Sequence, residues 1–265
     1  MSPMSRATEN ALARLTASEA ARRRLLSSPG EPLFIADWER ALMIHYEVDG
    51  VALQREVPFE LDLWKGRAFV SLVGFTLRDM RPRLGGQVAA LLLRPIATHE
   101  FLNVRAYVRQ GREVGIYFLR EWLSNRLSVM LGPCFFGLPY KLGRIEYKHM
   151  WEAGRFTGRV SDAARGGLFT YESVLDRTDQ ACESEPGSLT EWLMERYTAF
   201  TNRRGRPGFF RVWHEPWLQS PAEVKVINQT LLNSNWPLFR TAVRAGANFS
   251  RGLRNVWMGR LHNCR

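Results

Sequence analysis

The stretch that decides the fold is residues 135–147, FFGLPYKLGRIEY, because the sequence on either side is arranged around it. Apolar residues just before it have the i, i+4, i+7, i+8 spacing of an amphipathic helix: Leu123, Leu127, Met130 and Leu131. Gly132 and Pro133 then form a stop signal. We therefore expect a helix that ends at this glycine and leads into the stretch.

The second half of the stretch alternates as a half-buried strand does. The face predicted to be buried carries Lys141, Gly143, Ile145 and Tyr147. The face predicted to be solvated carries Leu142, Arg144, Glu146 and Lys148. Lys141 would then point inward, where burial readily lowers the pKa of a lysine. The alternative is a lysine at the strand start whose ammonium extends to water.

The composition, 45% hydrophobic and 24% charged, is typical of a globular protein. No apolar run approaches the roughly 18 residues of a membrane helix, and the N-terminus has no apolar signal core. The cysteines, Cys134, Cys182 and Cys264, form no C-x-x-C pair and predict neither a zinc site nor a disulfide framework. We therefore expect a cytoplasmic protein without a membrane span.

The net charge of +11 comes from arginines spread through nearly every segment. Such a spread predicts non-specific attraction to polyanions but no specific nucleic-acid site. Residues 204–207 read RGRP, the core of a minor-groove AT-hook. A hairpin turn between 198–200 and 209–212 is the interpretation that we favour.

Strand patterns dominate the chain. We expect strands at residues 41–48, 67–77, 101–109, 113–119, 141–148, 155–161, 168–175, 209–213 and 255–261. We expect helices at residues 11–26, 49–57 and 221–232, and a helix that opens with a capping box at 188–191. Many strands and few helices, without βαβ alternation, predict an α+β fold with a mostly antiparallel sheet. Residues 1–32 are interpreted as an N-terminal helical extension, and residues 33–265 as a single domain.

Standard catalytic motifs are absent from the sequence, including phosphate-binding and dinucleotide-binding loops. The histidines show no ligand spacing, so we expect no metal site and no cofactor. Asn103 and Arg105 share the polar face of the strand at 101–109. This face is either solvated or part of a polar cavity, where arginine would bind a carboxylate through its two-pronged guanidinium. Glu100, at the entry to that strand, is a candidate proton donor or lysine partner.

Several short motifs occur in an order that resembles the bacterial YqjF-like family, a domain of unknown function. They are ALMIHYEVD (41–49), VPFELD (57–62), FLNVRAYV (101–108), FGLPY (136–140), ERY (195–197), HEPW (214–217) and NVW (255–257). That family is placed in the acetoacetate decarboxylase-like superfamily. The resemblance implies a large, curved, mostly antiparallel sheet that closes into a barrel around a small-molecule cavity, with a few peripheral helices.

The resemblance also assigns candidate site residues. Acetoacetate decarboxylases carry two adjacent lysines after an aromatic-proline pair, of which the first forms a Schiff base and the second lowers its pKa. In this chain Tyr140 stands where the first lysine would be, and Lys141 matches the second. The cavity glutamate of the decarboxylases aligns with Glu100, and their substrate-binding arginine aligns near Arg40. Their second acidic residue aligns near Ser71.

These departures argue against a standard acetoacetate decarboxylase. We expect a barrel cavity for a small carboxylate or keto acid and possible lyase-like chemistry, with Lys141 and Glu100 as catalytic candidates. The expected binding residues are Arg105, Tyr140, Asn103 and Arg40. The alternatives are a non-catalytic small-molecule binding protein of the same fold and a basic surface protein that acts on nucleic acid or anionic membranes. Relatives of this superfamily also assemble into homo-oligomers, so a homo-oligomer is a further expectation.

Overall fold

Three long strands form the centre of the sheet in the computed structural model, which describes residues 17–175, 180–203 and 205–264. β1 (Phe34–Val48) pairs antiparallel with β3 (Ala68–Pro82) on one side and with β13 (Val243–Met258) on the other. Ten consecutive residues of β3, from 68 to 77, are buried. Apolar residues on both faces of a strand bury it on both sides, which is why β3 lies between two cores.

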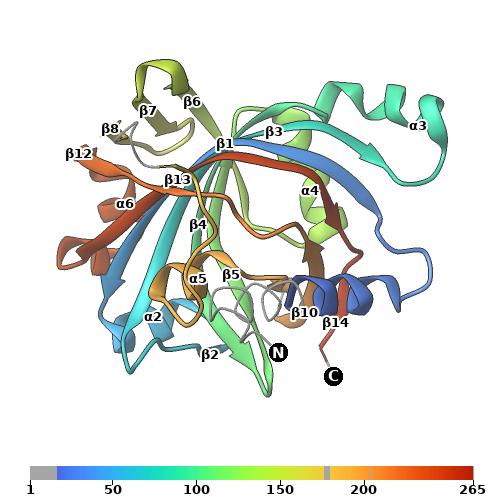
Figure 1. The fold of residues 1–265 in the computed structure, drawn as a ribbon, viewed down its shortest axis with the longest axis horizontal. Helices are drawn as coiled ribbons and strands as arrows, with labels where there is room; N and C mark the ends of the chain where they lie inside the picture. The colour runs from blue at the N-terminus through green and yellow to red at the C-terminus, as the bar shows by residue number, and fades with distance from the viewer. Residues whose placement is uncertain (1–16, 176–179, 204, 265) are drawn as a thin grey trace, which may run out of the picture.

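The central strands continue into a ring (Figure 1). β4 (His99–Gln110) joins β3 to β5 (Glu113–Leu123), and the hairpin of β9 (Thr198–Arg203) and β10 (Arg206–Trp213) joins β5 to β13. In the described chain, the β5–β9 and β10–β13 pairings rest on two residue pairs each, so the ring is only loosely closed at these seams. The predicted α+β fold with a large, curved, mostly antiparallel sheet is confirmed.

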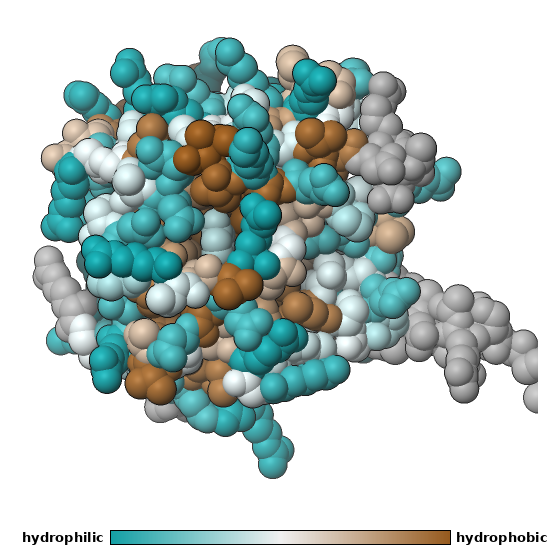
Figure 2. All heavy atoms as spheres, turned by 90° about the vertical axis from the view of Figure 1, so that its left-hand side faces the viewer, coloured by the Kyte–Doolittle hydropathy of each residue, from teal (hydrophilic) through white to brown (hydrophobic). Residues whose placement is uncertain are grey.

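A second group of strands, which we call the arm, extends from β5. β6 (Tyr140–Met150) runs parallel to β5, and β7 (Arg155–Asp162), β8 (Gly166–Val174) and β12 (Glu223–Gln229) follow antiparallel. Figure 2 views the molecule from the side that carries β12, where hydrophilic side chains separate the apolar ones. This surface is that of an ordinary solvated sheet face.

The remaining elements are short. The minor strands are β2 (Glu60–Leu61), β11 (Ser220–Pro221) and β14 (His262–Asn263). The helices are α2 (Gly50–Glu56), α3 (Gly86–Leu93), η1 (Arg94–Ile96), α4 (Arg126–Phe136), η2 (Trp151–Ala153), α5 (Leu189–Met194), α6 (Thr230–Asn235) and η3 (Pro237–Arg240). The two predicted N-caps are confirmed, because Asp49 and Ser188 each accept a hydrogen bond from a backbone N–H three residues on.

The two faces of the curved sheet bury separate cores. The outer core lies between the ring and the arm, and Phe156 of β7 contacts Phe249 of β13 in it with ring centroids 4.3 Å apart. The inner core fills the ring with aromatic and aliphatic side chains, including Phe69, Phe101 and Phe210. This division follows from the period-two alternation of the shared strands.

Several predicted elements differ from the structure, and the strand expected at 255–261 is only the end of the longer β13. The helix before the opening stretch runs through Gly132 and Pro133 and ends at Phe136, where Gly137 adopts φ 67° and its N–H bonds to the Pro133 carbonyl. Gly132 instead provides a close contact, because a Cβ there would lie 2.0 Å from the Tyr140 ring. The predicted helix at 221–232 is mostly β12, since pairing with β8 overrides its helical periodicity.

Within the predicted N-terminal extension, residues 17–26 form a helix that packs against β10. Leu25 is fully buried, and the Trp213 indole donates to the Ser18 carbonyl over 3.1 Å. The first part of the predicted helix, from residue 11 to 16, lies outside the described residues. No described helix is long and apolar enough to cross a membrane.

Candidate functional site

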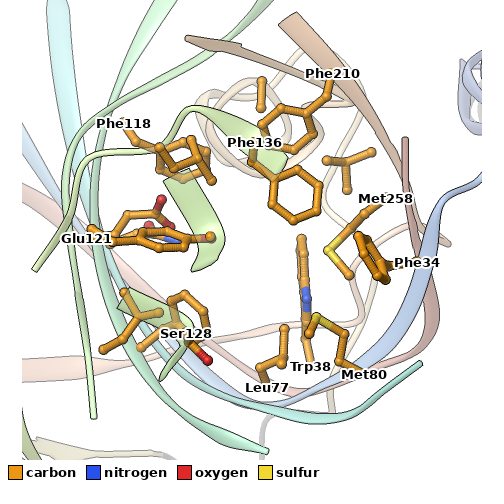
Figure 3. Close-up of a pocket in the computed structure, with 18 of the residues that line it drawn as sticks. Phe34, Trp38, Leu77, Met80, Phe118, Glu121, Ser128, Phe136, Phe210 and Met258 are labelled. Atoms are coloured by element: carbon orange, nitrogen blue, oxygen red, sulfur yellow. The ribbon is translucent and has the colours of Figure 1, made fainter. Parts of the chain in front are cut away.

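The inner face of the ring encloses a cavity of about 120 Å³. Most of its wall is apolar, and Figure 3 shows Phe118, Phe136, Phe210, Trp38 and Met258 arranged around it. Glu121 and Ser128 point into the same space. A concave, mostly apolar site with a few polar groups is the usual form of a small-molecule pocket.

Alternation along β4 places polar side chains inside this apolar wall. His99, Phe101, Asn103 and Arg105 line the cavity, whereas Leu102 and Val104 join the outer core. Asn103 and Arg105 therefore lie in a cavity wall, and the solvated alternative is wrong for these two residues, whereas Arg109 further along the strand is exposed. Asn103 and Arg105 are each 6% exposed.

Arg105 is a buried cation with few partners. Its Nη2 donates to the Leu193 carbonyl over 3.0 Å and lies 3.7 Å from the Met43 sulfur. Its Nε has no hydrogen-bond partner. Within the described residues, no carboxylate forms an ion pair with it. Because an unpaired buried charge is costly, this guanidinium is prepared for an anion that the protein itself does not supply.

A second guanidinium lies close by, on Arg196. Its Nη1 forms an ion pair with Asp62 at 2.7 Å, its Nε donates to the Trp192 carbonyl, and its Nη2 has no partner. Burial lowers the pKa of Arg196, and the charge of Arg105 lowers it further while Asp62 opposes the shift. Asp62 pairs with Arg196 and not with Arg105, so the two guanidiniums leave an excess of positive charge inside the ring.

Glu121 is the acidic group of the cavity. It is 3% exposed, its Oε2 has no partner, and burial raises its carboxyl pKa well above the usual range. The raised pKa favours the protonated form, which donates a hydrogen bond. Its strand neighbours are Asn103 of β4 and Tyr140 of β6. Burial and the charge of Glu121 together raise the pKa of the Tyr140 hydroxyl, so burial favours the protonated form of both groups.

Two further polar groups face the cavity. The Ser128 hydroxyl on α4 has no partner within hydrogen-bond distance. The His99 and Phe101 rings contact each other at a tilt, with centroids 4.7 Å apart. Burial lowers the pKa of His99 to about 4 against the opposing charge of Glu100. A neutral imidazole with that pKa is a weak base at neutral pH.

Of the six candidate site residues, three line the cavity: Tyr140, Asn103 and Arg105. Lys141 does not, and its predicted burial is wrong, because its side chain is exposed. The predicted alternation along the strand is right, since Gly143 and Ile145 are both buried and lie on the face that was predicted to be buried. That face belongs to the outer core, and the start of β6 is left uncovered there.

Glu100 and Arg40 also lie away from the cavity. Glu100 is on the outer face of β4, where it accepts a hydrogen bond from the Ser124 hydroxyl over 2.7 Å. Arg40 has φ 54° and donates to the Thr76 hydroxyl over 3.3 Å. Ser71 faces the ring interior but is bonded to His45 and Tyr107. Glu100 and Arg40, the acid and the arginine that the resemblance assigned to the site, thus do not meet in the inner cavity.

The lysines decide which chemistry this cavity can perform. All four lysines of the sequence, Lys65, Lys141, Lys148 and Lys225, are exposed. A Schiff base requires a lysine amine in contact with the carbonyl of the substrate. The cavity therefore has no lysine side chain for that reaction.

Glu121 and Arg196 were not among the candidates predicted from the sequence. The strand at 113–119 was expected to end two residues before Glu121. Arg120 and Glu121 are adjacent charged residues, a pattern that is typical of residues exposed to solvent. The usable signal was a lone acid within the apolar run 115–123. Arg196 lies in the ERY motif at 195–197, which the resemblance already contained.

Comparison with known proteins bears on the family and the fold of the chain. The chain is 28% identical over 200 residues to the uncharacterized protein YqjF of Bacillus subtilis (strain 168), a match that covers 75% of this chain and 79% of the relative. Structural similarity extends to an acetoacetate decarboxylase-like enzyme from Sphingomonas wittichii RW1, with a TM-score of 0.60, 15% identity and 88% and 95% of the two chains covered. An acetoacetate decarboxylase from Legionella pneumophila has a TM-score of 0.61 at 11% identity, with 91% and 94% covered.

A third solved structure is the enduracididine biosynthesis enzyme MppR complexed with pyruvate, with a TM-score of 0.59, 15% identity and 89% and 92% covered. At these identities the structures establish the fold, which is acetoacetate decarboxylase-like. A family model, DUF2071, described as an uncharacterized conserved protein, matches residues 35–247. Because this match spans most of the sequence, the chain belongs to the DUF2071 family.

Proposed function

We propose that the protein binds a small organic acid inside the ring, with the carboxylate at Arg105 and the apolar part among the aromatic side chains. The observation that carries the proposal is the buried Arg105 guanidinium, which has no acidic partner in the described chain. A ligand carboxylate would supply the missing charge and accept from the free Nε. The apolar wall would bury the rest of the ligand.

The size of the cavity limits the ligand. A cavity of about 120 Å³ is close to the roughly 150 Å³ that holds one benzene molecule in a protein core. A short-chain or aromatic acid, or a keto acid of similar size, therefore fits. The structural neighbour that binds pyruvate supports this chemical class.

Glu121 gives the cavity a possible reaction. A protonated carboxyl can donate a hydrogen bond to the carbonyl oxygen of a 3-keto acid. When the C–C bond to the carboxylate breaks, CO2 leaves, the bonding electrons form an enolate, and this hydrogen bond stabilises it. Such lyase-like chemistry needs no imine, which agrees with the exposed positions of all four lysines. The same observation also favours the second candidate, a binding protein of the same fold that performs no reaction.

The binding test is a thermal-shift and calorimetry screen of small carboxylic and keto acids against the wild type and Arg105→Gln. We expect at least one acid to bind the wild type and to lose roughly 30-fold or more in affinity in the variant, as for a charged hydrogen bond lost in a buried site. Arg109→Gln, an exposed arginine on the same strand, is the matched control and keeps the wild-type affinity. Equal affinity in both variants, or no binding by any acid, would overturn the proposal.

Turnover separates the two candidates. Loss of the bound acid over time in the wild type but not in Glu121→Gln supports the enzyme, and stable binding without product supports the binding protein. Borohydride treatment with keto acids is expected to give no adduct on the protein. A trapped adduct would contradict the assignment of non-covalent binding.

A further inference from the structure

Two helices near the cavity expose large apolar side chains. α3 has no buried residue. Eight exposed residues on and next to α3 and α4 form what we call the apolar rim: Leu84, Val88, Leu91, Leu92, Leu127, Met130, Leu131 and Phe135. Leu92, for example, is 76% exposed and Met130 is 71% exposed. Exposed apolar side chains gathered in this way mark an interaction surface.

The apolar rim borders the cavity. Leu131 and Phe135 belong to the rim and also line the cavity. Leu93 at the end of α3 and Ile96 in η1 are not rim residues, but they line the cavity too. The Asn125 side chain donates to the Pro95 carbonyl over 2.7 Å and so ties the start of α4 to η1. Figure 1 shows α3 projecting from the end of β3, away from the body of the sheet. The rim is therefore both prominent and continuous with the cavity wall.

The charge around the rim is mainly positive, with the exposed Asp79 as an acidic residue just before it. Residues 80–99 and 122–141 contain no aspartate or glutamate. Their arginines are Arg81, Arg83, Arg94 and Arg126, and none of these forms an ion pair within the described residues. The arm differs, since its exposed face mixes both signs, with Lys225 opposite Glu172 and Arg144 near Glu146.

We propose that the apolar rim docks on an anionic lipid bilayer. Apolar side chains enter the interface while the arginines contact acidic headgroups, the combination used by peripheral membrane proteins. A second copy of this chain is a poorer occupant, because a symmetric contact would bring the same arginines against one another. Docking turns the cavity toward the bilayer, from which an organic acid can enter. Membrane contact itself does not depend on what the cavity binds.

The test is co-sedimentation of the full chain with vesicles of phosphatidylcholine alone and with vesicles that also contain phosphatidylglycerol. We expect binding only to the anionic vesicles, and loss of binding in Leu91→Glu/Leu92→Glu. Ile227→Glu/Val243→Glu is the matched control, because Ile227 and Val243 are exposed apolar residues outside the rim. Arg94→Gln/Arg126→Gln is expected to weaken partitioning about tenfold, whereas Arg155→Gln/Arg159→Gln on β7 leaves it within about twofold.

Three outcomes would overturn the proposal. They are no binding of the wild type to anionic vesicles, equal loss in the rim and control variants, and binding by the rim variant at the wild-type level. Light scattering provides a separate check, since a wild-type dimer that dissociates in Leu91→Glu/Leu92→Glu would make the rim a contact between copies. Ligand binding in detergent-free solution is measured independently, so failure of membrane docking leaves the carboxylate proposal open to its own test.

Discussion

Two groups of polar side chains are buried inside the same ring, and they differ in how completely they are bonded. In the first group the His45 ring contacts Ser71 Oγ at 2.6 Å and Asn248 Oδ1 at 3.1 Å, and the Tyr107 hydroxyl donates to the Leu193 carbonyl. We call this group the bonded cluster. Each ring nitrogen of His45 thus has a partner within hydrogen-bond distance, Ser71 at Nδ1 and Asn248 at Nε2.

The second group lines the cavity and is incompletely bonded. Asn103 Oδ1, Arg105 Nε, Glu121 Oε2 and Ser128 Oγ have no partners. Buried polar atoms are nearly always bonded in folded proteins, so a group of exceptions in one cavity requires an explanation. The comparison shows how a structural network can be told from a binding site: the first satisfies itself, and the second leaves atoms for a ligand.

The bonded cluster should be the more sensitive group for stability. We expect His45→Ala to reduce the free energy of unfolding by about 3 kcal/mol, because it leaves a cavity and unbonded groups on Ser71 and Asn248. Urea denaturation followed by tryptophan fluorescence measures the change. A loss below about 1 kcal/mol would mean that the cluster is not a structural network.

We expect acid to lower the stability of the protein through its buried histidines. Burial lowers the pKa of His45 to about 3 and that of His149 to about 4, against 6.5 when unfolded. Each contributes stability that is present above pH 6.5 and is lost as the pH falls toward its folded pKa, because only the unfolded chain then binds the proton. We expect the free energy of unfolding of the wild type to fall between pH 6.5 and 4, and less steeply in His45→Gln. Identical slopes would contradict the assignment.

Substitutions among the polar residues that line the cavity should change the free energy of unfolding least. Glutamine mimics a protonated carboxyl, so we expect Glu121→Gln to change the free energy of unfolding by less than about 1 kcal/mol near pH 4.5. The raised pKa of Glu121 means that its contribution is complete below its unfolded pKa and is lost as the pH rises through the folded value. The stability of the wild type relative to the variant should therefore decline with rising pH. A constant difference would show that Glu121 is ionised or solvated.

The sequence predicted the fold well because alternation was clean in the ring strands. The apolar run at 67–77 and the alternation at 101–109 predicted β3 and β4, and the turn at 202–207 is the β9–β10 hairpin. Pairing overrode local preference at 221–232, which forms β12. Helix and strand periodicity cannot be told apart reliably in so short a segment.

The site was less predictable for a geometric reason. Alternation assigns a side chain to one face of a strand, but it does not reveal what covers that face. Lys141 was assigned to the buried face of its strand, yet the cavity lies on the other face, where Tyr140 lines it. Arg105 lies on the cavity wall, which agrees with the cavity interpretation rather than with the solvated one. Its role as a carboxylate ligand stays a prediction.

The loosely closed β5–β9 seam gives unusual importance to a residue without a side chain. Gly115 lies beside Thr198, and a methyl group on its Cα would stand 2.4 Å from the Thr198 carbonyl oxygen. Only two residue pairs hold β5 to β9 in the described chain. Any larger residue at position 115 must therefore push the β9–β10 hairpin outward. The diameter of the ring, and with it the dimensions of the cavity, depends on a position that touches neither the ligand space nor the rim.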